Sequence, residues 1–112
     1  MTDVLAQLET VIQKRLSANP DDSYVASLHE AGLNKILEKV GEESFEVVLA
    51  ARDCEHSENK TKVVEETADL LFHTLVMLAH LGLSHNDVLN VLAKRQGLSG
   101  IAEKASRENN QA

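Results

Sequence analysis

The sequence predicts an all-α protein built as an antiparallel bundle of about four to five helices. Apolar residues recur at helical spacing in several long segments, and Leu, Val and Ala far outnumber the three aromatic residues, Tyr24, Phe45 and Phe72. The 112 residues, 43% of them hydrophobic, are enough for one domain. We assign this domain to residues 1–105 and a flexible tail to 106–112. So small a helical chain is expected to complete its core by forming a homodimer.

The first helix is expected over residues 3–18, where apolar side chains lie on one face. These side chains are Val4, Leu5, Leu8, Val11, Ile12 and Leu16. Asn19–Pro20 ends the helix, because proline lacks a backbone donor and restricts the residue before it. A polar turn over 21–24 follows, then a short helical segment through Leu28–Ala31 and a break at Gly32.

A long helix is expected from about Asn34 to Arg52, with Asn34 or a nearby residue as its N-cap. Its predicted inward face carries Ile36, Val40, Ser44, Val47 and Ala51. Residues 53–60 have no periodic apolar pattern and are predicted to form a loop.

The next helix is expected over residues 61–81, with Gly82 as its C-terminal glycine. It is apolar nearly all round, which predicts a buried helix. One polar stripe runs along it, formed by Glu66, Asp69, His73 and His80.

Ser84 and Asp87 match a capping box at the start of a last helix, which is expected to continue to about Arg95. Its predicted inward residues are Val88, Leu89, Val91 and Leu92. Gly97 and Gly100 mark a break after this helix.

Charge and cysteine content exclude several classes of protein. Eighteen acidic residues against eleven basic ones give a net charge of −7, which argues against nucleic-acid binding. No apolar run approaches the length of a membrane span, and we expect no signal peptide. Cys54 is the single cysteine, so no intrachain disulfide is expected and a reducing, cytoplasmic setting fits.

Two pairs of carboxylates stand out within the apolar helical segments. Glu43 and Glu46 form one pair and Glu66 and Asp69 the other, each spaced three residues apart and therefore on one helical face. Charged groups on apolar faces are unfavourable unless a cation neutralises them. Mg²⁺ suits such a cluster, because it prefers carboxylate and water ligands and commonly carries the phosphates of a substrate. The pattern predicts a magnesium-dependent phosphate enzyme.

Further charged residues are candidates for the chemistry. Glu42 or Glu65 can serve as a general base, and Lys35, Lys39 and Lys94–Arg95 can contact substrate phosphates. The alternative is that these side chains form solvated helix surfaces, with the two lysines of the long helix paired to nearby glutamates.

His73 is a further candidate contact to the substrate, and its alternative is a hydrogen-bonded interior histidine. A carboxylate-bridged iron site, as in ferritin-like bundles, is disfavoured. It usually has Glu-x-x-His at a spacing of three, whereas Asp69 and His73 are four apart.

Two motifs resemble those of a known family. The segments 41–46 (GEESFE) and 65–73 (EETADLLFH) look like the E-x-x-E…E-x-x-D signature of the all-α nucleoside-triphosphate pyrophosphohydrolases. More narrowly, the runs 23–25, 32–43 and 97–104 resemble the phosphoribosyl-ATP pyrophosphatase family. The resemblance extends over nearly the whole chain, from residue 4 to residue 105.

The resemblance implies a function and a set of site residues. It implies hydrolysis of 1-(5-phosphoribosyl)-ATP to 1-(5-phosphoribosyl)-AMP and pyrophosphate, the second step of histidine biosynthesis, in a stand-alone enzyme. It also implies Mg²⁺ held by Glu43, Glu46, Glu66 and Asp69. Two alternatives stay open: a house-cleaning pyrophosphatase for other nucleoside triphosphates, which shares the acidic motif, and a non-catalytic helical interaction module.

Overall fold

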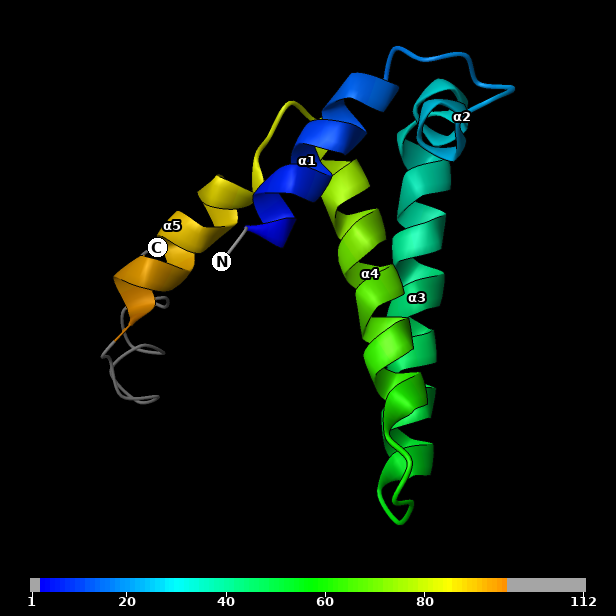
Figure 1. Ribbon diagram of the computed structural model, residues 1–112, viewed down its shortest axis with the longest axis vertical. Coiled ribbons are helices and arrows are strands. Elements are labelled where there is room, and N and C mark those ends of the chain that lie inside the picture. The colour runs from blue at the N-terminus through cyan, green and yellow to red at the C-terminus, as the bar shows by residue number, and fades with distance from the viewer. Residues whose placement is uncertain (1–2, 97–112) are drawn as a thin grey trace, which may run out of the picture.

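The computed structural model describes residues 3–96, which contain five α-helices and no β-strand (Figure 1). This confirms the predicted all-α class. The helices are α1 (Val4–Arg15), α2 (Tyr24–Ala31), α3 (Leu33–Cys54), α4 (Thr61–His80) and α5 (His85–Arg95). The expectations for residues 97–104 and for the tail 106–112 lie outside the described residues.

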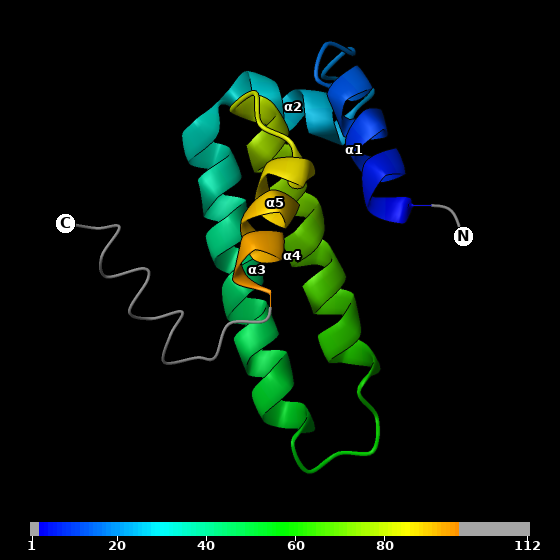
Figure 2. The same ribbon diagram turned by 90° about the vertical axis from the view of Figure 1, so that its left-hand side faces the viewer.

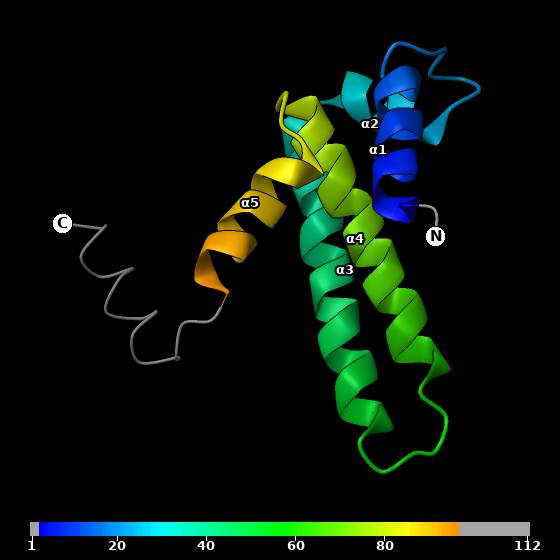
Figure 3. The same cartoon turned by 60° about the vertical axis from the view of Figure 1, so that its left-hand side comes forward.

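The centre of the fold is an antiparallel hairpin of the two longest helices. Figures 1 and 3 show α3 and α4 side by side along their lengths, joined by a loop at one end. At the opposite end, α2 and α1 cover the start of α3 and the last turns of α4. Helix α5 turns away from this hairpin, and Figure 2 shows it from the side on which it projects. The arrangement is therefore an open hairpin with three shorter helices at one end.

The hydrophobic core lies at the end of the hairpin that α1 and α2 cover. Its buried residues come from four helices and are Ile12, Val25, Leu28, Ile36, Leu75, Val76 and Leu78. The other half of the hairpin buries far less, with Ala50 as its one fully buried apolar residue among those described. The core therefore holds one end of α3 and α4 firmly, and the polar middle of the hairpin starts where this core ends.

Local signals at the helix ends explain most of the boundaries. The Ser84 hydroxyl and the Asp87 carboxylate form the predicted capping box of α5. Gly82 has φ +76°, a left-handed conformation that suits the glycine predicted to end α4. The N-cap of α3 is Gly32 (φ +103°), not Asn34, because α3 begins directly after α2 and leaves no turn for a polar cap.

Several faces predicted to be buried are exposed in the single chain. The apolar side chains predicted to face inward on α5 are 42–53% exposed, because this helix contacts α1 chiefly near its first turn. Helix α4 is not buried all round, and Val64 is 66% exposed. On α3, Ser44 and Ala51 are exposed while Ala50 is buried, because α4 is the one helix that packs along that half.

Other boundaries differ by a few residues. Helix α1 is shorter than the predicted 3–18, because Leu16 caps its C-terminus and a turn follows. Asp53 and Cys54, assigned to the loop, form the last turn of α3. Among the described residues no single helix is long and apolar enough to span a membrane. Only α4 and α5 together reach that length and composition, with a 110° bend between them.

One carboxylate joins α1 to the start of α5. The Oε1 atom of Glu9 accepts from the backbone N–H of His85 (2.7 Å), and Oε2 lies 2.8 Å from Nδ1 of His85 and 3.1 Å from the Ser84 hydroxyl. Both side chains of the Glu9–His85 pair are nearly buried, at 12% and 6% exposure. Burial alone would raise the pKa of Glu9, but the hydrogen bonds from His85 and Ser84 outweigh it and lower the pKa.

We expect Glu9→Gln to lower the free energy of unfolding by about 2 kcal/mol at neutral pH, since hydrogen bonds to a buried charged group are lost. Because the folded pKa is lowered, ionised Glu9 stabilises the fold fully above 4.5, its ordinary pKa. This contribution is lost as the pH falls through the lower folded value. Urea unfolding between pH 7 and pH 3 measures the difference. Glu58→Gln, on the α3–α4 loop, is the control, and a difference that grows below pH 4.5 would contradict the assignment.

Candidate metal-binding site

Three carboxylates from the two paired helices converge in the middle of the hairpin. Glu43 on α3 and Glu66 and Asp69 on α4 each offer one oxygen, and these oxygens lie within 4.8 Å of one another. Glu43 and Glu66 are half-buried and Asp69 is exposed, so the group opens to solvent on one side. The antiparallel pairing of α3 with α4 places these positions opposite each other. One member of the first acidic pair and both members of the second, separate in the sequence, thus form one cluster.

Glu46 lies beside this group without being one of its three members, and it is exposed. It nevertheless acts on Glu66, whose pKa is raised first by burial and then by the negative charges of Glu46, Asp69 and Glu43. Lys62 opposes this effect only weakly. The expectation that both acidic pairs occupy buried faces is therefore wrong, since Glu43 and Glu66 are only half-buried and Glu46 and Asp69 are exposed.

The cluster fits a hard divalent cation. Within residues 3–96, no lysine or arginine forms a salt bridge with any of the four acids. The oxygens of Glu43, Glu66 and Asp69 converge without a salt bridge to a basic side chain, an arrangement that a bound cation would stabilise. All the donors are carboxylate oxygens, the ligand type that Mg²⁺ prefers.

The two lysines of α3 already have partners. The ammonium group of Lys39 lies 3.2 Å from Glu42, and that of Lys35 lies 3.6 Å from Glu38. The hydrogen bond and charge of Glu42 raise the pKa of Lys39, with smaller contributions from Tyr24 and Glu43. The surface pairing considered from the sequence, to Glu42, Glu43 or Glu46, is thus present for Lys39, whereas Lys35 pairs with Glu38. Lys39 also lies close enough to the cluster to interact with Glu43.

The remaining candidates are less closely grouped. Glu65 is exposed, and because it is adjacent to Glu66 on α4 it lies on a different face of the helix. Lys94 and Arg95 occupy the end of α5, which Figures 1 and 3 show pointing away from the α3–α4 hairpin. The single chain therefore does not bring these two basic residues to the acidic cluster.

His73 is buried, and both of its ring nitrogens have partners within the chain. Nδ1 lies 2.9 Å from the backbone carbonyl oxygen of Asp69, and Nε2 lies 2.9 Å from the hydroxyl of Tyr24. Farther along the same stripe, Nδ1 of His80 lies 2.8 Å from Nδ1 of His29. Sequence reasoning assigned Tyr24 to a polar turn and missed this contact. The one available signal was the match of segment 23–25 to a family run.

The fold and the site define a small all-α protein that carries a carboxylate cluster between two antiparallel helices. Residues 5–96 match the phosphoribosyl-ATP pyrophosphohydrolase family, and the chain belongs to this family of hydrolases. A relative from Hydrogenovibrio crunogenus (strain DSM 25203 / XCL-2) is 54% identical over 110 residues, which cover 98% of this chain and 97% of the relative. That protein is named phosphoribosyl-ATP pyrophosphatase.

The crowded carboxylates predict a specific response to Glu66→Gln. In EDTA we expect a higher midpoint of thermal unfolding than for the wild type, because the variant removes like-charge repulsion from Glu43, Glu46 and Asp69. We also expect Mg²⁺ to raise the midpoint of the wild type and to leave that of the variant unchanged. Circular dichroism melts with and without Mg²⁺ measure both effects. Glu58→Gln should behave as the wild type, and a full Mg²⁺ response in Glu66→Gln would contradict the cluster as a cation site.

Proposed function

We propose that this protein hydrolyses 1-(5-phosphoribosyl)-ATP to 1-(5-phosphoribosyl)-AMP and pyrophosphate, a step of histidine biosynthesis, in the cytoplasm. The observation that carries the proposal is the convergence of Glu43, Glu66 and Asp69 between α3 and α4 in a chain of this family. The name of the relative from Hydrogenovibrio crunogenus supports the same substrate.

In this proposal Glu43, Glu46, Glu66 and Asp69 hold Mg²⁺. When bound, the ion neutralises negative charge on the phosphate oxygens and orients them for attack. The chain supplies the carboxylates on two rigid helices, so their spacing is set before the substrate arrives. The pKa of Glu66 is raised first by burial and then by the neighbouring negative charges, and a bound cation would relieve the second of these effects.

The other candidates take supporting roles in the proposal. Glu42 or Glu65 is the general base that accepts a proton from the attacking water. Both are exposed on the turns that carry the cluster, so water and substrate can reach them. Lys35 and Lys39 contact substrate phosphates. The hydrogen bond and the charge of Glu42 raise the pKa of Lys39, so its ammonium group stays protonated. His73 borders the substrate site in this proposal, and its ring nitrogens bind the Tyr24 hydroxyl and the Asp69 carbonyl oxygen.

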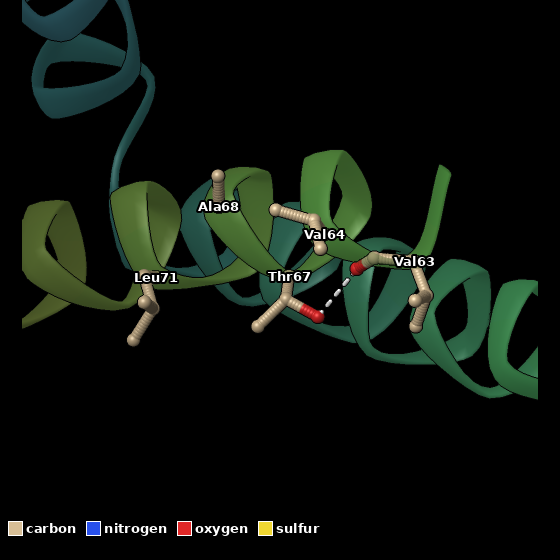
Figure 4. Close-up of a pocket in the computed structure, with 5 residues that line it drawn as sticks. All are labelled: Val63, Val64, Thr67, Ala68 and Leu71. Carbon is tan, nitrogen blue, oxygen red and sulfur yellow. Dashed lines mark hydrogen bonds between the residues drawn. The ribbon is translucent and has the colours of Figure 1, made fainter. Parts of the chain in front are cut away.

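We further propose that the protein is a homodimer that covers an apolar patch on α4. The patch consists of Val63, Val64, Thr67, Ala68 and Leu71. Figure 4 shows these side chains along one side of α4, where the Thr67 hydroxyl donates to the Val63 carbonyl (2.7 Å) and is thereby used within the helix. Of these side chains, Val64 and Leu71 remain 66% and 50% exposed, and water contact with this apolar surface favours association.

The patch continues into a second apolar surface, which points to a large interface. Leu71 also lines a groove between α1, α4 and α5 whose other walls include Leu5, Leu75 and Leu89. A second copy that fills this groove would bury the exposed face of α5. In such a dimer the basic end of α5, Lys94 and Arg95, would approach the acidic cluster of the other copy.

The proposed reaction is tested by pyrophosphate release from phosphoribosyl-ATP with and without Mg²⁺. We expect rapid Mg²⁺-dependent release by the wild type and a loss of at least about 100-fold in kcat for Asp69→Asn, since a ligand is removed. Glu58→Gln should keep wild-type activity. If pyrophosphate is released from dCTP or dUTP but not from phosphoribosyl-ATP, the protein is instead a house-cleaning nucleoside-triphosphate pyrophosphatase. A folded wild type inactive on all three would favour an interaction module.

The proposed dimer is tested by Leu71→Asp, which places a charge where the patch and the groove meet. We expect the wild type to sediment as a dimer and Leu71→Asp as a monomer, because a buried unpaired charge opposes association. Leu81→Asp, equally exposed at the end of α4, is the matched control and should stay dimeric. A monomeric wild type at micromolar concentration would contradict the proposal.

A further inference from the structure

Tyr24 is held in place at the first turn of α2, although its side chain is half exposed. Tyr24 is 49% exposed, and it is the only tyrosine in a chain without tryptophan. The N-cap Ser23 fixes the turn that carries it, since the Ser23 hydroxyl accepts from the N–H of Ala26 (3.2 Å). The ring packs against Phe72 with 6.4 Å between ring centroids and 18° between ring planes.

The hydroxyl of Tyr24 has one defined role. The carbonyl oxygen of Asp69 can only accept, so Nδ1 of His73, 2.9 Å away, carries a proton and donates it. In the neutral ring Nε2 is then the acceptor, and the Tyr24 hydroxyl, at 2.9 Å, donates to it. The Tyr24 oxygen therefore offers only lone pairs to any other group. A phosphate, itself an acceptor, is a poor partner for it.

Helix geometry places Tyr24 one turn from the acidic cluster. Lys39 precedes Glu43 by four residues on α3, and His73 follows Asp69 by four residues on α4. Because the two helices are antiparallel, both steps lead toward α2, by about 6 Å at a rise of about 1.5 Å per residue. Tyr24, which contacts His73 and contributes to the raised pKa of Lys39, lies at this level.

What remains available on Tyr24 is the exposed part of its aromatic ring. Its hydroxyl is bonded to His73 and its ring rests on Phe72, so little freedom is lost when a planar group stacks on it. Stacking on an aromatic side chain is a recurrent way of binding a nucleic-acid base. A ribose joins the base of a nucleotide to its first phosphate and spans a separation of the order found here.

We propose that Tyr24 is a binding residue for the purine base of the substrate, which stacks on its ring while the phosphates lie at the acidic cluster. This inference rests on the proposed function and adds a direction to it, with the base toward α2 and the phosphates toward the middle of the hairpin. Lys39, at the level of Tyr24 and hydrogen-bonded to Glu42, then lies beside the ribose and the first phosphate.

The proposal can be tested by fluorescence, because Tyr24 is the only tyrosine and the chain has no tryptophan, so all tyrosine fluorescence comes from Tyr24. We would titrate the wild type with AMP and with pyrophosphate, both with Mg²⁺, and correct for absorption with free N-acetyltyrosinamide. AMP should quench the fluorescence saturably, whereas pyrophosphate, which has no base, should not. No saturable quenching by AMP, or equal quenching by pyrophosphate, overturns the proposal.

Two variants separate the ring from the hydroxyl. Tyr24→Leu should raise KM for phosphoribosyl-ATP about 10-fold with a smaller change in kcat, because the stacking surface is lost. Tyr24→Phe keeps the ring and should stay within about 2-fold of the wild-type KM. An unchanged KM in Tyr24→Leu, or an equal increase in both folded variants, overturns the proposal.

The outcomes for the inference and for the proposed function stay distinct. A wild type that releases no pyrophosphate from phosphoribosyl-ATP contradicts the function, whereas AMP quenching concerns Tyr24 alone. Far-UV circular dichroism establishes that each variant is folded. If Tyr24→Leu does not fold, the AMP titration of the wild type and the KM of Tyr24→Phe still decide the matter.

Discussion

The close approach of like charges between α3 and α4 is the constraint on which the rest of this structure depends. Glu43, Glu66 and Asp69 bring their oxygens within 4.8 Å of one another, and Glu46 adds its charge nearby. The charge of Lys62 offsets this repulsion only weakly, so the hairpin must be held together elsewhere. The core residues that α1 and α2 pack against the end of the hairpin supply that stability. The stabilising core and the acidic cluster thus occupy different parts of the same two helices.

The contacts between these two parts are few and specific. His73 is anchored in the buried end of α4, and its ring joins Tyr24 on α2 to the backbone of Asp69 in the cluster. On α3, Lys39 lies one turn from Glu43 and donates a hydrogen bond to the carboxylate of Glu42. A substrate that spans the acidic cluster and the level of Tyr24 would therefore contact three helices, each of which is positioned by the core. At the other side of the fold, Glu9 secures the first turn of α5 in a comparable way.

The open apolar surfaces give the molecule its second organising feature. Helix α5 is bonded to α1 at its start, but its apolar side remains exposed across a groove from α4. The patch on α4 meets this groove at Leu71. A chain of this size buries only a modest fraction of its surface on folding, so leaving these apolar side chains exposed is unfavourable. In the proposed dimer the same surfaces complete the core and decide where Lys94 and Arg95 lie.

The sequence by itself determined the helical class, the capping box at Ser84, the glycine at the end of α4 and the acidic pairs, because these depend on neighbours within one or two turns. Only the tertiary structure decided which faces are buried and which charges meet. The exposure of Val64 and the contact of Tyr24 with His73 depend on how helices distant in the chain pack. The link between Glu9 and His85 likewise joins residues that local periodicity cannot relate. Helical spacing repeats along one axis, whereas the site and the core arise from the angles between axes.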